Sequence, residues 1–156
     1  MNLLPFFQWC EASGVGTAIR DSQWLFPIIE AFHLLAFAAI GGAILVVDLR
    51  LLGLAMRLEP PGELSRDAQP WLLGGLAVMV TTGTLLFLSE SVKCYYSNPF
   101  RVKMTALLLA IIFTFTVRRK VAADGGVPLR DKLVALISIV LWSAVAWGGR
   151  WIGFSG

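Results

Sequence analysis

The stretch WLFPIIEAFHLLAFAAIGGAILVVDLR, residues 24–50, decides the fold of this chain. Its apolar run would extend roughly 36 Å as an α-helix, whereas the hydrocarbon core of a bilayer is roughly 30 Å thick. The run therefore predicts a membrane-spanning helix. Glu30 and His33 interrupt it, and their spacing of three places them on one helix face. Ionisable groups inside a span are costly, so they mark a candidate functional site.

The composition of the whole chain is typical of a membrane protein. Of its 156 residues, 57% are hydrophobic, which exceeds the roughly 45–50% of a soluble globular domain. The net charge of +3 is small and the basic residues lie near the ends of apolar runs, which does not favour nucleic-acid binding. The length allows a single membrane domain, 1–156. The chain lacks a phosphate-binding loop and an HExxH motif, so a hydrolase or an ATPase is not favoured.

The order of apolar runs and breakers predicts an all-α integral membrane four-helix bundle. The predicted transmembrane helices cover about residues 23–54, 71–92, 98–117 and 129–152. Pro-Pro-Gly and the charges beside it predict a loop over 57–70, and Arg118-Arg119-Lys120 is expected to end the third span. Residues 3–20 predict a short helix that lies in the membrane interface and is ended by Gly14 and Gly16.

Four spans place both ends of the chain on one side of the membrane. Eight of the 13 Lys and Arg residues flank the two loops, and five lie on the other side. These cations favour the cytoplasmic side, so the sequence predicts cytoplasmic loops and periplasmic termini. The loop-flanking cations are Arg50, Arg57, Arg66, Arg118, Arg119, Lys120, Arg130 and Lys132. Cys10 and Cys94 fall on the outer side, where they could form a disulfide.

Several spans bring ionisable groups into the outer half of the predicted bundle. From the helical rise, His33 lies roughly 13 Å from the outer face, Glu30 roughly 9 Å and Lys103 roughly 8 Å. Arg150 lies closer to the surface. The third apolar run is too short to cross alone, so its helix must include Arg101 and Lys103 in its first turns.

The first of three interpretations of these groups is structural. Glu30 would pair with Lys103 or Arg101, Glu90 would pair with Arg150, and the imidazole would bond to a backbone carbonyl or a threonine. Such interactions hold helices together in lipid. The protein would then be a non-enzymatic membrane subunit.

The second interpretation is a haem b site for electron transfer or redox chemistry at the periplasmic side. A neutral imidazole is a common axial ligand, and helical bundles commonly hold the porphyrin. His33 would be the axial ligand and Lys103 a second ligand or a partner of a propionate. Arg101 and Arg150 would supply positive charge, and Glu30 would tune the histidine. A redox partner protein would then be required.

The third interpretation is a metal site or a proton path. Glu30 and His33 follow the Glu-x-x-His pattern of carboxylate metal sites, but such sites need a second motif that only a symmetric dimer could supply. Met56, Met79 and Met104 could pass a soft ion such as Cu(I). Small residues on the first two spans also allow a homo-oligomer.

Four segments resemble an uncharacterised family of bacterial four-helix inner-membrane proteins, known only as a domain of unknown function. They are WLFPIIEAFHLLAFAAIGGAILVVDLRLLG (24–53), TTGTLLF (81–87), NPFRVKM (98–104) and GRWIGF (149–154). The resemblance implies a multi-pass protein of the bacterial inner membrane. A fainter similarity reaches the HemJ-type protoporphyrinogen oxidases and the CopD-type copper resistance domains. The HemJ-type family has a haem-linked histidine in its first span and a lysine in a later span, which implies that His33 and Lys103 act together.

Overall fold

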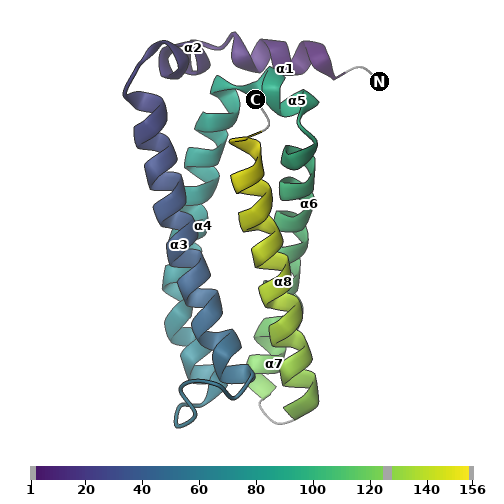
Figure 1. The fold of residues 1–156 in the computed structure, drawn as a ribbon. Helices are drawn as coiled ribbons and strands as arrows, with labels where there is room; N and C mark the ends of the chain where they lie inside the picture. Colours follow the sequence, from purple (N-terminus) through teal and green to yellow (C-terminus); the bar gives the residue numbers. More distant parts are fainter. Residues whose placement is uncertain (1–2, 125–127, 155–156) are drawn as a thin grey trace.

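The computed structural model describes residues 3–124 and 128–154, which form helices and no strands. Long helices stand side by side, and short helices lie across one end (Figure 1). In the described part, four helical stretches are long and apolar enough to cross a membrane: Leu25–Leu51, Pro61–Ser89, Asn98–Asp124 and Pro128–Ile152. The predicted all-α membrane bundle is confirmed. Residues 125–127, in the loop predicted before the fourth span, lie outside the described residues.

The first pair of long helices is α3 (Leu25–Leu51) and α4 (Pro61–Ser89). Ser22 Oγ accepts a hydrogen bond from the backbone N–H of Leu25 at 3.2 Å, which caps the start of α3. The predicted loop over 57–70 is wrong beyond Pro60, because α4 begins at Pro61. A proline fits the first turn of a helix, where its missing N–H has no partner to lose. Glu63, Arg66 and Asp67 therefore lie on an exposed helical extension of the span.

The second pair consists of one bent helical stretch and the last helix. Its elements are α6 (Asn98–Phe113), the π-helix η1 (Thr114–Arg118), α7 (Arg119–Asp124) and α8 (Pro128–Ile152). The sequence predicted that the basic cluster at 118–120 ends the third span. This prediction is wrong. Helix continues to Asp124 because Arg118 is buried inside the bundle and does not reach the membrane surface.

The end of the bundle that carries α1 (Leu4–Glu11) and α2 (Gly14–Asp21) is here called the outer end, and the opposite end the inner end (Figure 1). The single helix predicted over 3–20 is two helices. Gly14 begins α2 and does not end a helix, because Ser13 Oγ accepts a hydrogen bond from the Gly16 N–H at 3.2 Å. The short α5 (Ser91–Tyr96) lies at the same end and contacts α1, where Phe7 and Tyr95 meet edge to face.

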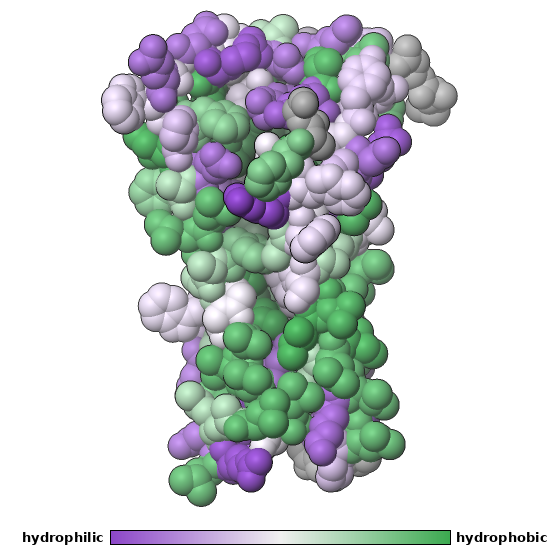
Figure 2. Space-filling view, in the orientation of Figure 1, coloured by the Kyte–Doolittle hydropathy of each residue, from purple (hydrophilic) through white to green (hydrophobic). Residues whose placement is uncertain are grey.

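Two clusters of buried apolar residues form the core. One lies in the middle of the bundle and includes Ile40, Met79 and Trp142, and the other lies nearer the inner end around Val47 and Val134. Apolar side chains also cover much of the outside of the bundle, and polar ones gather mainly over the outer end (Figure 2). A belt of exposed apolar residues is what a lipid-facing surface requires. The polar groups of the outer half lie beyond this core.

Candidate functional site

His33 lies on α3 and faces α4, where its Nδ1 is 2.9 Å from Thr82 Oγ1. The Thr82 hydroxyl donates its own proton to the carbonyl oxygen of Val78 at 2.7 Å. When the Thr82 hydroxyl donates to this carbonyl, Thr82 accepts a hydrogen bond from the imidazole and the ring proton lies on Nδ1. In this tautomer Nε2 keeps its lone pair free for a ligand.

The absence of a side chain at Gly83 makes room for the imidazole between α3 and α4. A Cβ atom at Gly83 would lie 3.2 Å from His33 Cε1 and 3.7 Å from Nδ1. The ring is thus bounded by Thr82 on one side and by the backbone of α4 on another. Packing of this kind holds the imidazole in one orientation, as a preorganised ligand requires.

Lys103 on α6 supplies the positive charge that acts on His33. Its side chain runs along two glycines of α8: a Cβ atom at Gly148 would lie 3.0 Å from Lys103 Cβ, and one at Gly149 would lie 3.5 Å from Nζ. Lys103 forms no ion pair with another described residue. A half-buried ammonium without a carboxylate partner favours a nearby anionic group.

The other three predicted site residues lie apart from this pair. Glu30 is exposed. Arg101 is exposed and its Nη2 donates to the carbonyl oxygen of Tyr95 at 3.0 Å. Arg150 is exposed, with its guanidinium 4.7 Å from the centre of the Phe154 ring. The structure therefore brings together His33 and Lys103, and leaves the arginines at the outer surface.

The ion pairs predicted by the structural interpretation do not form among the described residues. Glu30 meets neither Lys103 nor Arg101, because the lysine side chain is directed along α8. Glu90 pairs with Lys93 at 3.8 Å and does not reach Arg150. Glu90 and Lys93 are three positions apart at the start of α5, a spacing that brings side chains together on one helix face.

Both cysteines are free thiols in this structure. Cys10 on α1 is buried and Cys94 on α5 is half-buried, so neither belongs to a disulfide here. The described residues also contain no group of three or more His, Cys, Asp and Glu side chains that could hold a metal ion. Within one chain, His33 is therefore a single nitrogen donor and not part of a carboxylate metal cluster.

Sequence reasoning missed a second polar site, which lies toward the inner end. Arg118 Nε donates to Asp48 Oδ1 at 2.6 Å, and Arg118 Nη2 donates to the carbonyl oxygen of Ile44 at 2.9 Å. The Asp48 side chain is fully buried and that of Arg118 is 4% exposed. The Ser138 hydroxyl on α8 also acts on the Asp48 carboxylate, although neither Ser138 Oγ nor Asp48 Oδ2 reaches hydrogen-bonding geometry with any group in the described part of the chain. The Asp48–Arg118 pair connects α3 to η1 across the bundle.

The sequence did contain a signal for this buried pair. On α3 the buried residues recur with helical spacing, and Asp48 lies on that stripe: Ala36, Ile40, Ile44, Val47, Asp48 and Leu51. On the third span the buried positions Ala106, Ala110, Thr114 and Arg118 follow at intervals of four. A charged residue in register with a buried stripe predicts a buried partner. From the sequence alone, Arg118 was predicted to lie at the end of the third span, so its pairing with Asp48 was not expected.

The donor set at His33 fits one axial bond to a haem iron. Nε2 is free, and the Thr82 oxygen orients the ring through Nδ1, as outer partners of metal-bound histidines do. Of the aromatic residues near this level, Phe37 and Phe87 are half-buried, whereas Trp147 is 73% exposed. The two described cavities lie elsewhere and do not border His33.

One of the comparisons with known proteins gives a match, and that match covers nearly the whole chain. Searches of curated proteins and of solved structures each found no match. None of these comparisons shows a similarity to HemJ-type or CopD-type proteins, so both similarities stay predictions. A family model matches residues 6–155, and that family is described as a family of unknown function, DUF6644. The chain therefore belongs to the DUF6644 family.

Proposed function

We propose that this protein binds a b-type haem through His33 and takes part in electron transfer or redox chemistry near the outer end of the bundle. The observation that carries the proposal is the 2.9 Å contact between His33 Nδ1 and Thr82 Oγ1. With the ring proton on Nδ1, this contact leaves Nε2 as an oriented donor to a metal. An imidazole held in this way is typical of histidines that ligate metals. The haem would supply a centre that accepts and releases single electrons.

The surrounding charges support the same proposal. Lys103 lies within electrostatic reach of the imidazole and has no carboxylate partner among the described residues. Its ammonium could neutralise a propionate or serve as a second ligand. Arg101 and Arg150 add positive charge near the outer surface, where anionic propionates would emerge.

We also propose that the membrane is a bacterial inner membrane and that the outer end faces the periplasm. The bundle gathers the loop-flanking cations, including Arg57, Arg66 and Arg119, toward its inner end, which favours the cytoplasm for that end. On this orientation the His33 site is served from the periplasmic side. A redox partner would approach the outer end.

The haem proposal is tested by the absorption spectrum of detergent-purified protein, oxidised and dithionite-reduced, with a pyridine haemochrome assay. We expect a Soret band at near-stoichiometric haem in the wild type and its loss in His33→Ala. Thr82→Val should keep the pigment but raise its midpoint potential, because the ligand loses a hydrogen bond that increases its basicity. Thr84→Val is the matched control, since Thr84 bonds only to the Val80 carbonyl and is exposed.

A colourless wild type after expression with added haem would overturn the proposal. So would a His33→Ala variant that keeps its pigment at full occupancy. Either result would favour the alternative, a non-enzymatic membrane subunit whose polar groups are structural. In that case metal analysis of the purified protein would separate a metal-handling protein from a purely structural one.

A further inference from the structure

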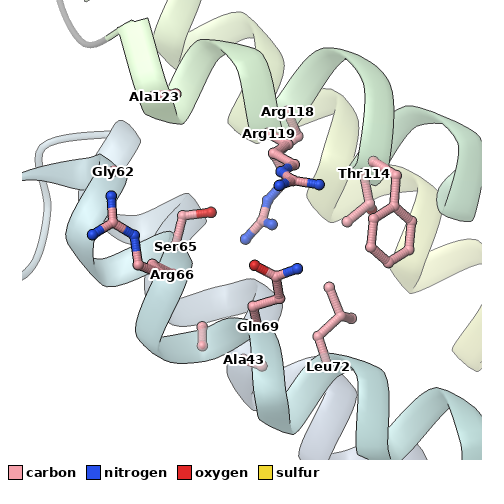
Figure 3. A pocket seen from close by; sticks show the side chains of 12 residues that line it. Ala43, Gly62, Ser65, Arg66, Gln69, Leu72, Thr114, Arg118, Arg119 and Ala123 are labelled. Carbon is pink, nitrogen blue, oxygen red and sulfur yellow. The ribbon is translucent and has the colours of Figure 1, made fainter.

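A cavity that three arginines help to line lies between α4 and the η1–α7 stretch, near the inner end. Its volume is about 180 Å³, several times what one water molecule needs. Its polar lining residues are Ser65, Arg66, Gln69, Thr114, Arg118 and Arg119. Ser65 and Gln69 point from α4 toward Arg118 and Arg119 (Figure 3). Arg66 lies beyond Ser65 at the rim, where its guanidinium is directed toward Gly62 and away from the other two arginines.

The charge of this cavity is positive and only partly balanced. Three arginines line it, and no lining residue is acidic. The buried Asp48 carboxylate neutralises the charge of Arg118. Arg66 and Arg119 are exposed, and neither has an ion-pair partner within residues 3–124 and 128–154. Two unbalanced guanidinium groups at one cavity favour an anionic ligand.

Neutral hydrogen-bonding groups complete the lining. The side chains of Ser65 and Gln69 are not used in hydrogen bonds to other described residues. Thr114 accepts a hydrogen bond from Trp142 Nε1 at 3.2 Å and keeps its own proton for donation. Hydroxyl, amide and guanidinium donors together suit a ligand that presents several oxygen atoms.

The position of the cavity along the bundle agrees with a ligand at the level of lipid headgroups. Arg66 lies about one and a half turns before Trp71, which is 70% exposed and belongs at a membrane interface. Basic pockets between membrane helices bind anionic headgroups on the cytoplasmic side. A phosphate group could reach the cavity from a lipid or from solution.

We propose that this cavity is a binding site for a phosphate group, contacted by Arg66 and Arg119 and completed by Ser65 and Gln69. Guanidinium groups match phosphate oxygens in geometry as well as in charge. Arg118 is a positioning residue, because its bond to Asp48 fixes the π-helical turn that immediately precedes Arg119. π-helical turns frequently occur at functional sites. The site lies at the opposite end of the bundle from His33 and does not depend on the proposed haem.

The test measures the thermal unfolding of the purified protein in detergent while one probe is titrated at constant ionic strength. The probes are inorganic phosphate, short-chain phosphatidylglycerol and, as a control, short-chain phosphatidylcholine, whose cation opposes the arginines. The variant Arg66→Gln/Arg119→Gln removes the two exposed cations of the site. The matched control Arg57→Gln/Lys120→Gln removes the same charge from exposed residues that do not line the cavity.

We expect saturable stabilisation of the wild type and of the control by a phosphate-bearing anion. The site variant should need at least tenfold more probe for the same shift. Stabilisation by inorganic phosphate alone identifies a soluble ligand, and stabilisation only by phosphatidylglycerol identifies a lipid headgroup. If neither anion stabilises the wild type beyond phosphatidylcholine, or if both double variants weaken the effect equally, the proposed site is wrong.

Discussion

Asp48 and Arg118 show how a membrane bundle tolerates full charges in its interior. Arg118 bonds to the Asp48 carboxylate and to the Ile44 carbonyl, so its charge and two of its donors are matched locally. Each partner alone would be an uncompensated charge away from water, which is far more costly than the pair. Connecting α3 to η1 is therefore a structural role that neither residue can perform alone.

Removing one partner of this pair should be strongly destabilising. We expect Asp48→Leu or Arg118→Met to lower the free energy of unfolding by about 3–5 kcal/mol, and the double variant to recover most of the loss. Unfolding in detergent, followed by circular dichroism, provides the measurement. Asp124→Asn is the control, because the Arg130–Asp124 pair is exposed and contributes at most about 1 kcal/mol. Additive losses in the double variant would contradict a direct interaction.

The Cys94 thiol at the outer end should be unreactive in the folded protein. Burial, with a further effect of the neighbouring Glu90 carboxylate, raises the pKa of Cys94 from 9.0 to about 11. Because the thiolate is the reactive form, we expect slow alkylation by N-ethylmaleimide at neutral pH and a rate that rises toward pH 11. The Cys10→Ala background removes the other thiol, and protein unfolded in SDS provides the reference.

The same raised pKa links Cys94 to stability. The folded state holds the thiol proton more strongly than the unfolded state does. The stabilisation from Cys94 is therefore fully present below pH 9 and is lost as the pH rises through about 11. An alkylation profile in the folded protein that turned upward at the same pH as in SDS would contradict this account.

At the scale of helices, Gly75 sets how closely α3 and α4 approach. A Cβ atom at Gly75 would lie 2.7 Å from Ile40 Cγ1 and 3.1 Å from the Ala36 carbonyl oxygen. Because the second of these is backbone, side-chain movement alone cannot relieve the overlap. Gly75→Ala should therefore destabilise the protein by about 1–3 kcal/mol.

The adjacent Gly74 is a close control for this prediction. A Cβ atom there would meet nothing within 4 Å, so Gly74→Ala should be neutral or stabilising by up to about 1 kcal/mol through helix propensity. Thermal unfolding of the two variants in the same detergent makes the comparison. Equal effects would show that α3 and α4 do not pack at Gly75 as described.

The element boundaries show where sequence reasoning succeeds and where it stops. Apolar length predicted the four membrane helices, because the bilayer thickness sets the number of residues needed. It could not predict that α4 begins at Pro61, since a helix can extend beyond the bilayer once a proline provides its first turn. The predicted end of the third span also came too early. Arg118 has the position of a cation that flanks a span, and only its buried partner Asp48 shows that it lies inside the bundle.

At the scale of the whole molecule, the sequence predicted part of the candidate site. His33 and Lys103 were chosen for their depth within the spans, and the structure brings them within electrostatic reach. A threonine partner for the imidazole was among the expectations, and Thr82 fills that role. The position of this threonine and the glycines beside both side chains were not predicted, because helix rotation and contacts across the bundle decide them. Glu30 shares a helix face with His33 in the sequence, but the packing of α3 leaves it exposed.

The orientation of the whole bundle is the last prediction, and it decides which compartment meets each end. We expect the loop between α3 and α4 to be cytoplasmic, because the loop-flanking cations gather there. In a Cys10→Ala/Cys94→Ala background, Leu58→Cys lies in that loop at a residue that is 97% exposed, and Asp21→Cys lies at the outer end, also exposed. A membrane-impermeant maleimide should label Asp21→Cys in intact cells and Leu58→Cys only after permeabilisation. The reverse labelling pattern would place the His33 site on the cytoplasmic side and the arginine-lined cavity on the periplasmic side.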